Sequence, residues 1–250
     1  MVIGDMANIE NLNNIVVAQC YSLDEDKYAE MEKEYEILAK AKKENNEDEI
    51  EIVKINKSRQ KIELLKVPIV IDLVDKYLEN NKSIVIFVNF IETMNKLKDI
   101  LSYKKINYSA LYGDLNLEER DIEINKFQTN VNKIIICTMQ VGSQSISLHD
   151  LSGKSPRVSL ILPSFSSIDL IQAFGRTHRV GLKSPVTQKI ILCNDPNEKL
   201  ICDKIKEKIK FNIKLAENDT QNIVTKNLLE SMNNINMNIN SDGINLDDLF

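Results

Sequence analysis

The chain has 250 residues, of which 43% are hydrophobic, and a formal net charge of −5 at pH 7. This length and composition suit one large domain or two small ones with a sizeable core, and the charge argues against a protein coated with basic residues, although a local basic groove remains possible. Because no apolar run approaches the ~20 residues of a membrane span and the N-terminus lacks a signal pattern, we expect a soluble, intracellular protein without membrane contact.

Residues 1–64 are expected to contain a strand and a charged helical arm. The apolar run at 15–18 is typical of a strand, whereas residues 24–63 are rich in Glu, Asp and Lys and contain neither Gly nor Pro. Apolar residues recur in this segment at roughly helical spacing. The pattern predicts one or two long exposed helices, broken near 44–48, that form a solvated arm; a coiled-coil tether is a weaker alternative.

Residues 65–215 alternate between apolar runs and amphipathic segments. Helices are expected after residue 90, after a capping pair at Asn116 and Glu119, and over about 197–214. Buried strands are predicted at 83–88, 108–112, 133–137, 158–162 and 189–192. Such alternation predicts an α/β fold, a parallel sheet covered by helices on both faces. Ligands of such sheets sit at the carboxyl ends of the strands, where segments 89–90, 113–114, 138–148 and 163–167 begin.

Two arginines stand close together just beyond the predicted strand at 158–162. On a continuous helix, Gln172, Arg176 and Arg179 share one face because they are spaced i, i+4 and i+7. Ser166 and Asp169 can form a capping pair at the start of that helix. Buried guanidinium groups must meet an anion or water, and a phosphate or carboxylate is their usual partner. A pair of interdomain salt bridges is the alternative.

Four motifs in order resemble those of superfamily 2 helicases over about residues 65–212. Residues 84–90 resemble motif IV, residues 137–148 resemble motif V, and Gln172-x-x-Gly175-Arg176-x-x-Arg179 resembles motif VI. The conserved block after motif IV is matched by Gly113-Asp114, Glu119-Arg120, Ile124 and Phe127. The resemblance is to the Swi/Snf-like and Strawberry-notch-like branches, and most closely to helicases of large DNA viruses. A viral protein of this kind would act in the host cytoplasm or a virus factory.

This resemblance implies that residues 65–215 form the second RecA-like lobe of a nucleic-acid-dependent ATPase or helicase. The family's arginines matching Arg176 and Arg179 reach across a cleft to ATP and act as catalytic arginine fingers. Positions on the nucleotide side are matched by Gln172, Gly142 and Gly175. Positions beside the DNA or RNA backbone, where contacts carry no sequence information, are matched by Asn89, Phe90, Gly113, Thr138 and Ser143.

The chain departs from the family pattern in two ways. Ser143 and Ser145 stand where Swi/Snf-type members usually have glycines. The sequence also has no GxxxxGK[ST] loop and no suitably placed Asp-Glu pair; residues 153–155 imitate the end of such a loop, but they precede a strand and lack the earlier glycine.

These departures lead to two hypotheses. In the first, ATP and Mg²⁺ are held mainly by a first RecA-like lobe, in the same polypeptide or on a separate chain, so this chain alone should not hydrolyse ATP. Whether it counts as an enzyme is therefore open. In the second, the chain is a non-catalytic, degenerate lobe that binds nucleic acid or a protein partner.

The remaining candidates are interpreted as structural. His149 and His178 are expected to be polar packing residues, and the four scattered cysteines to be free thiols, with no metal site. Residues 216–250 contain six acids, one base and many asparagines, which predicts an acidic, mobile tail.

Overall fold

A computed structural model describes residues 14–43, 49–142, 146–163, 166–215, 229–230 and 233. Within these residues, one six-stranded sheet has the order β1-β6-β5-β2-β4-β3, and every pair of neighbours is parallel. The strands are β1 (Asn14–Tyr21), β2 (Ser83–Val88), β3 (Tyr108–Leu111), β4 (Ile134–Thr138), β5 (Arg157–Ile161) and β6 (Val186–Cys193). Each predicted strand is present, which confirms the α/β fold with a parallel sheet.

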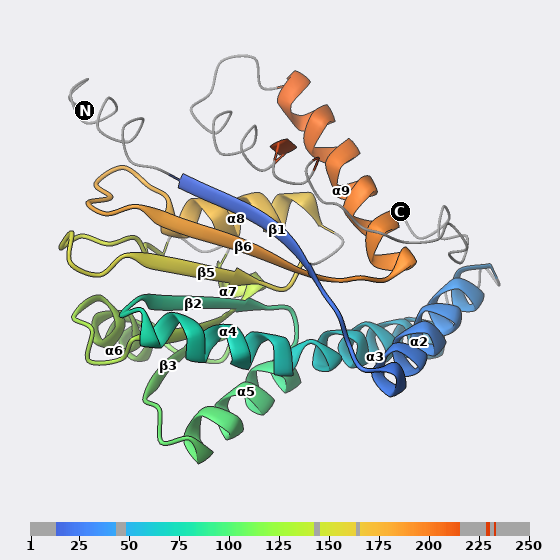
Figure 1. Ribbon diagram of the computed structural model, residues 1–250, viewed down its shortest axis with the longest axis horizontal. Helices are drawn as coiled ribbons and strands as arrows, with labels where there is room; N and C mark the ends of the chain where they lie inside the picture. The colour runs from blue at the N-terminus through green and yellow to red at the C-terminus, as the bar shows by residue number, and fades with distance from the viewer. Residues whose placement is uncertain are drawn as a thin grey trace.

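Helices cover both faces of the sheet, with α4 in front and α8 behind in the view of Figure 1. The longer helices are α2 (Glu25–Lys43), α3 (Glu49–Leu65), α4 (Val67–Glu79), α5 (Ile91–Tyr103), α6 (Leu117–Gln128), α8 (Ser167–Thr177) and α9 (Pro196–Leu215), and α7 (Met139–Gly142) is a single turn. Because helices exclude water from both sides, all residues of β2, β4 and β5 are buried, as the continuous apolar runs predict.

The sequence predicted the start of one helix, α6, correctly and missed two other helices, α4 and α7. The predicted capping pair at α6 is confirmed as a capping box, in which the Asn116 side chain accepts a hydrogen bond from the Glu119 amide and the Glu119 carboxylate accepts one from the Asn116 amide. Helix α4 was not predicted; Pro68 lies in its first turn, where proline is compatible with a helix. The short α7 was also missed, because residues 138–148 were expected to form a loop.

The N-terminal segment is part of the core, contrary to the solvated arm that we expected. Strand β1 pairs with β6 along its whole length and forms one edge of the sheet. On α2, Met31, Tyr35 and Leu38 are at most 1% exposed and belong to the main hydrophobic core. The expectation was wrong because most of the charged residues lie on the outer face of the segment, whereas its apolar residues pack into the core. The division of the chain at residue 64 remains a prediction, and the predicted helix break at 44–48 lies outside the described residues.

Two further expectations concern segments that the structure describes little or not at all. Residues 216–250, interpreted as a mobile tail, fall almost wholly outside the described part of the chain. Among the helices that are described, none is both long enough and apolar enough to cross a membrane.

Candidate functional site

Helix α8, which carries the motif VI residues, is held against the sheet by its apolar face and by hydrogen bonds at its last turn. Its side chains Leu170, Ala173 and Phe174 are buried. At its end, the Thr177 hydroxyl lies 2.8 Å from the Ser159 hydroxyl of β5 and accepts a 2.8 Å hydrogen bond from the Gln188 amide of β6. The last turn of α8 therefore has a fixed position over β5 and β6.

The helix ends before Arg179, so the predicted common face of Gln172, Arg176 and Arg179 is wrong for the last of these residues. Thr177 is the last helical residue, and His178 is extended, with φ −113° and ψ 101°. The chain then turns at Gly181, which has a φ of +91°, and reaches the start of β6 at Val186.

Arg179 nevertheless lies near Arg176, because both are bonded to the segment 146–149 at the end of motif V. The Arg179 guanidinium donates hydrogen bonds to the Ile146 carbonyl at 3.2 Å and to the Ser147 hydroxyl at 2.7 Å. The Leu148 amide donates to the Arg176 carbonyl at 2.9 Å. Motifs V and VI are therefore bonded to each other, and both arginines are attached to the same four-residue segment.

The environment of this arginine pair suits an anion. Arg176 and Arg179 are both half-buried. Burial lowers the pKa of Arg176, and the nearby positive charge of Arg179 lowers it further. One turn earlier on α8, the side-chain oxygen of Gln172 is buried without a hydrogen-bond partner in the described residues. An anion between the arginines would relieve their repulsion, and a bound ligand could supply the donor that Gln172 lacks.

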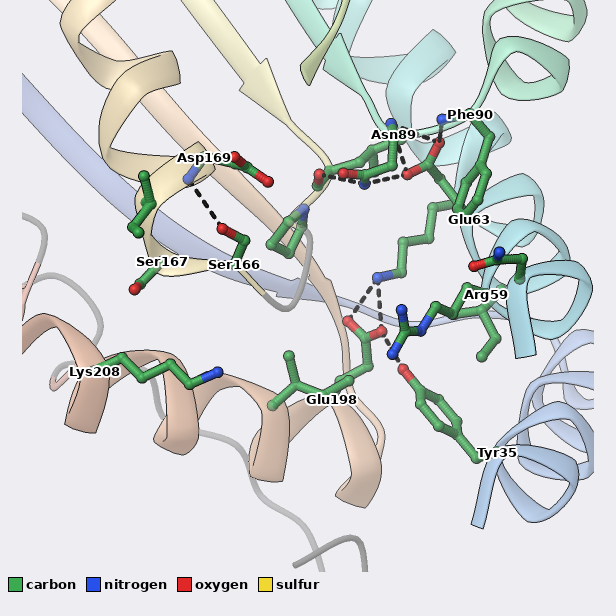
Figure 2. Close-up of a pocket in the computed structure, with 17 residues that line it drawn as sticks. Tyr35, Arg59, Glu63, Asn89, Phe90, Ser166, Ser167, Asp169, Glu198 and Lys208 are labelled. Carbon is green, nitrogen blue, oxygen red and sulfur yellow. Dashed lines mark hydrogen bonds and ion pairs between the residues drawn. The ribbon is translucent and has the colours of Figure 1, made fainter. Parts of the chain in front are cut away.

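The residues at the end of motif IV lie at a different place, the carboxyl edge of the sheet. The buried Glu63 carboxylate of α3 accepts hydrogen bonds from the backbone amides of Asn89 and Phe90, at 3.1 and 3.2 Å, and from the Asn89 side chain. Asn89 also donates to the Leu162 carbonyl at 3.0 Å. Figure 2 shows these contacts. Glu63, which the sequence analysis missed, therefore fixes the chain where α5 begins.

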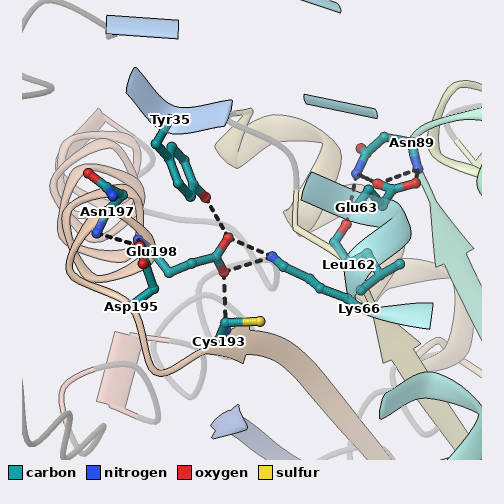
Figure 3. A network of polar contacts seen from close by, with 9 residues as sticks. All are labelled: Tyr35, Glu63, Lys66, Asn89, Leu162, Cys193, Asp195, Asn197 and Glu198. Carbon is teal, nitrogen blue, oxygen red and sulfur yellow. Dashed lines mark hydrogen bonds and ion pairs between the residues drawn. The ribbon is translucent and has the colours of Figure 1, made fainter. Parts of the chain in front are cut away.

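A cavity of about 530 Å³ opens beside Asn89, between α3, the start of α8 and α9. Its floor holds a buried ion pair, in which Lys66 donates to both oxygens of Glu198 at 2.7 Å. Burial disfavours the charged form of Lys66, but the neighbouring Glu198 outweighs it and raises the pKa of Lys66. Glu198 also accepts from the Tyr35 hydroxyl at 2.6 Å and the Cys193 amide at 3.3 Å (Figure 3). The predicted arginines do not line this cavity.

The other predicted site residues are spread along the same edge. Gly113 is exposed and accepts a 3.0 Å hydrogen bond from the Arg120 guanidinium, while Thr138 ends β4 and is buried. Gly142 ends α7, Gly175 lies in the last turn of α8, and Ser143 is outside the described residues. The structure thus divides the candidates between this edge and the arginine pair.

The sequence 153–155, rejected above as a phosphate loop, forms a turn around Asp150. The Asp150 carboxylate accepts hydrogen bonds from the Ser152 amide at 2.9 Å, the Ser152 hydroxyl at 2.7 Å and the Ser155 amide at 3.0 Å. Burial tends to raise the pKa of Asp150, but the Ser184 side chain and the hydrogen bonds from Ser152 and Ser155 together outweigh it and lower the pKa to about 2. The turn precedes β5 and therefore lies at the amino edge of the sheet, which supports the rejection.

The residues interpreted as structural also have definite environments. His149 is buried and His178 is half-buried, and burial lowers the pKa of both, which keeps them neutral near pH 7. All four cysteines are free, and burial raises the pKa of each thiol. In the described part of the chain no group of three His, Cys, Asp or Glu side chains could hold a metal ion.

Comparison with known proteins shows that this chain is similar to helicases. Residues 61–181 match the family model described as the helicase conserved C-terminal domain. A protein of Acanthamoeba polyphaga mimivirus named "Putative ATP-dependent RNA helicase" is 42% identical over 209 residues, which are 83% of this chain. The chain spans only 38% of that relative's length.

Solved structures show the same fold at lower sequence identity. The C-terminal part of the Fun30 ATPase domain has a TM-score of 0.58 at 17% identity, over 78% of this chain and 90% of that one. The Sulfolobus solfataricus SWI2/SNF2 ATPase core in complex with dsDNA has a TM-score of 0.55 at 17% identity, over 89% of this chain and 48% of that one. The parallel sheet described above is therefore RecA-like.

Proposed function

We propose that the chain is the second lobe of a nucleic-acid-dependent ATPase, because residues 61–181 match the family model described as the helicase conserved C-terminal domain. In this proposal, Arg176 and Arg179 act as arginine fingers towards ATP held on a first lobe. That lobe is in the same polypeptide or on a separate chain. The 42% identity with the mimivirus relative, whose name specifies ATP dependence and RNA, supports the use of ATP.

One observation carries the proposal: the two arginines of motif VI converge on the segment 146–149 of motif V. The Arg179 guanidinium is bonded to Ile146 and Ser147, and the backbone carbonyl of Arg176 accepts a hydrogen bond from the Leu148 amide. The positive charge of Arg179 lowers the pKa of Arg176, so an anion beside both guanidinium groups would be bound favourably. The arrangement is therefore suited to a group that carries several negative charges, such as a triphosphate.

In the proposed reaction, the two arginines and Gln172 act on the bound nucleotide in different ways. ATP, with Mg²⁺ bound mainly by the first lobe, supplies the phosphoryl group that is transferred to water. Arg176 and Arg179 stabilise the negative charge that develops on that phosphoryl group. Gln172 offers its unpartnered oxygen to orient the nucleotide or a neighbouring donor, and Gly142 and Gly175 lie close to the nucleotide.

We place the nucleic-acid backbone at the carboxyl edge of the sheet, beside Asn89, Phe90, Gly113, Thr138 and Ser143. Gly113 is exposed, which leaves its amide accessible to a phosphate. The solved archaeal relative in complex with dsDNA makes DNA a reasonable partner, and the name of the mimivirus relative makes RNA another. Both should bind without strong sequence preference.

The test is nucleic-acid-stimulated ATP hydrolysis by a chimera in which this chain replaces the matching segment of the mimivirus relative. Arg176→Ala and Arg179→Ala should each lower kcat by about 10³-fold or more, because an arginine finger contributes roughly that factor. Lys126→Ala is the matched control, since in the described part of the chain the Lys126 side chain pairs with Glu123 alone, on the surface of α6. Unchanged turnover in either arginine variant would remove that arginine from the site.

The second function, a degenerate lobe that binds nucleic acid or a partner, is favoured by the internal hydrogen bonds of Arg179, because a purely structural arginine would make the same contacts. This function predicts salt-dependent binding of DNA or RNA by the chain. It also predicts that the chimera does not hydrolyse ATP, whatever residue stands at position 176 or 179.

A further inference from the structure

Gln128, at the end of α6, also contacts the segment 146–149, to which both arginines are bonded. Its side-chain nitrogen donates hydrogen bonds to the carbonyls of Ser147 at 2.9 Å and His149 at 3.2 Å. These two carbonyls flank Leu148, which is fully buried and whose amide bonds to Arg176. The segment is therefore bonded both to Gln128 and to Arg176 and Arg179.

The orientation of the Gln128 amide is fixed by Arg157. The Arg157 guanidinium donates to the Gln128 oxygen at 2.9 Å and to the Asn130 oxygen at 3.2 Å, and it lies 4.2 Å from the centre of the Phe127 ring. Since a guanidinium only donates and a backbone carbonyl only accepts, the amide of Gln128 has a single orientation that satisfies all three bonds.

Burial of the Arg157 guanidinium at this position is energetically unfavourable. It is 1% exposed, and its contacts in the described part of the chain are amide oxygens and an aromatic ring rather than a carboxylate. Burial lowers its pKa to about 10, and the negative charge of Asp150 offsets this effect only in part. A buried charge whose direct partners are neutral is unfavourable for folding, which points to a role for Arg157 beyond packing.

We infer that Gln128, oriented by Arg157, is a positioning residue for the arginine finger Arg179, because it sets the place of the segment 146–149 to which Arg179 is bonded. This inference rests on the proposed function. Ser147 is the link: its carbonyl accepts from Gln128, and its hydroxyl accepts from Arg179. A displacement of Ser147 is therefore transmitted to the Arg179 guanidinium.

The informative variant is Gln128→Glu. A glutamate has the same shape and can still accept from Arg157, as an ion pair, so the fold and α6 should be retained. It cannot donate to the Ser147 and His149 carbonyls, and its charge repels them. Thr129→Ala is the matched control, because the Thr129 hydroxyl bonds only to α6 carbonyls, at 2.7 Å for Asn125.

The first measurement is hydrogen exchange of the Leu148 amide in the full chain, without nucleotide or partner. Gln128→Glu should accelerate exchange at Leu148 by about tenfold or more, since local opening becomes easier, while Thr129→Ala leaves it unchanged. Unchanged exchange at Leu148 in Gln128→Glu would overturn the inference. This result does not depend on ATP hydrolysis, so it separates failure of the inference from failure of the proposed function.

The second measurement is ATP hydrolysis by the chimera described above. Gln128→Glu should lower kcat by roughly 10- to 100-fold with little change in KM, the effect expected of a misplaced catalytic group. The loss should disappear in the Arg179→Ala background, because Gln128 acts through that side chain. A normal kcat in Gln128→Glu, with a low kcat in Arg179→Ala, would overturn the positioning role. An unaffected Arg179→Ala would instead contradict the proposed function.

Discussion

At the scale of single residues, the described part of the chain contains two buried cations, Arg157 and Lys66, with very different partners. The Arg157 guanidinium is bonded to amide oxygens and lies over an aromatic ring, and Asp150 acts on it only as a nearby charge. Lys66, in contrast, makes two 2.7 Å contacts with a single carboxylate, Glu198, and both side chains are at most 5% exposed. Buried pairs contribute little net stability as pairs, but breaking one leaves an uncompensated charge.

Breaking the buried pair should therefore be costly. Lys66→Met is expected to lower the free energy of unfolding by about 3–5 kcal/mol, because Glu198 is left buried without its cation. Lys104→Met, which removes a pair with Asp75 that is 34–38% exposed, should cost less than about 1 kcal/mol. Urea denaturation of the full chain measures both. Equal losses in the two variants would show that the Lys66 pair is not the buried, low-dielectric contact described here.

At the scale of elements, the position of α8 relative to the sheet decides where the arginines lie. The helix starts at the carboxyl edge, after β5, and its last turn bonds to Ser159 and Gln188 in the middle of β5 and near the start of β6. The arginine pair is thus carried away from Asn89 and Phe90. Sequence alone placed all candidates at one edge, since it located only the start of the helix.

The Thr177 hydroxyl is the contact that should fix the last turn of α8. Thr177→Val keeps the shape but leaves the Ser159 hydroxyl and the Gln188 amide without this partner in a buried site, at an expected cost of about 1–3 kcal/mol. Thr129→Val, at an exposed position, should change stability by less than about 0.5 kcal/mol. Thermal unfolding of the chain compares the two. A neutral Thr177→Val would mean that apolar packing alone holds α8.

At the scale of the whole molecule, the N-terminal segment forms one edge of the sheet and contacts the start of α9. Strand β1 completes the sheet beside β6, and α2 places Tyr28 on the Asn194 carbonyl and Tyr35 on Glu198, at the start of α9. Figure 1 shows β1 and α9 on the same side of the molecule. Segments more than 160 residues apart in sequence thus form one unit.

Deletion of residues 1–43 should therefore lower the stability of the remaining domain, and not merely remove an independent segment. Loss of the buried Met31, Tyr35 and Leu38 side chains removes roughly 1.5–3 kcal/mol each. The exchange of α9 backbone amides should accelerate, because Glu198 loses Tyr35. Deletion of residues 1–13 alone, which leaves β1 in place, is the control. Unchanged α9 exchange after removal of residues 1–43 would support the independent arm that the sequence suggested.

The sequence by itself determined the strands, the parallel sheet, the order of the motifs and the capping of α6. These follow from local properties: strands buried on both faces are rich in apolar residues, and a capping box spans only four residues. Local spacing could not show where α8 ends, that Glu63 binds the amides of Asn89 and Phe90, or that α2 has a buried face. It also could not show that Gln128 and Arg179 both bind Ser147. Each of these depends on contacts between residues distant in the chain, such as Lys66 with Glu198, and such contacts exist only once the sheet has brought those segments together.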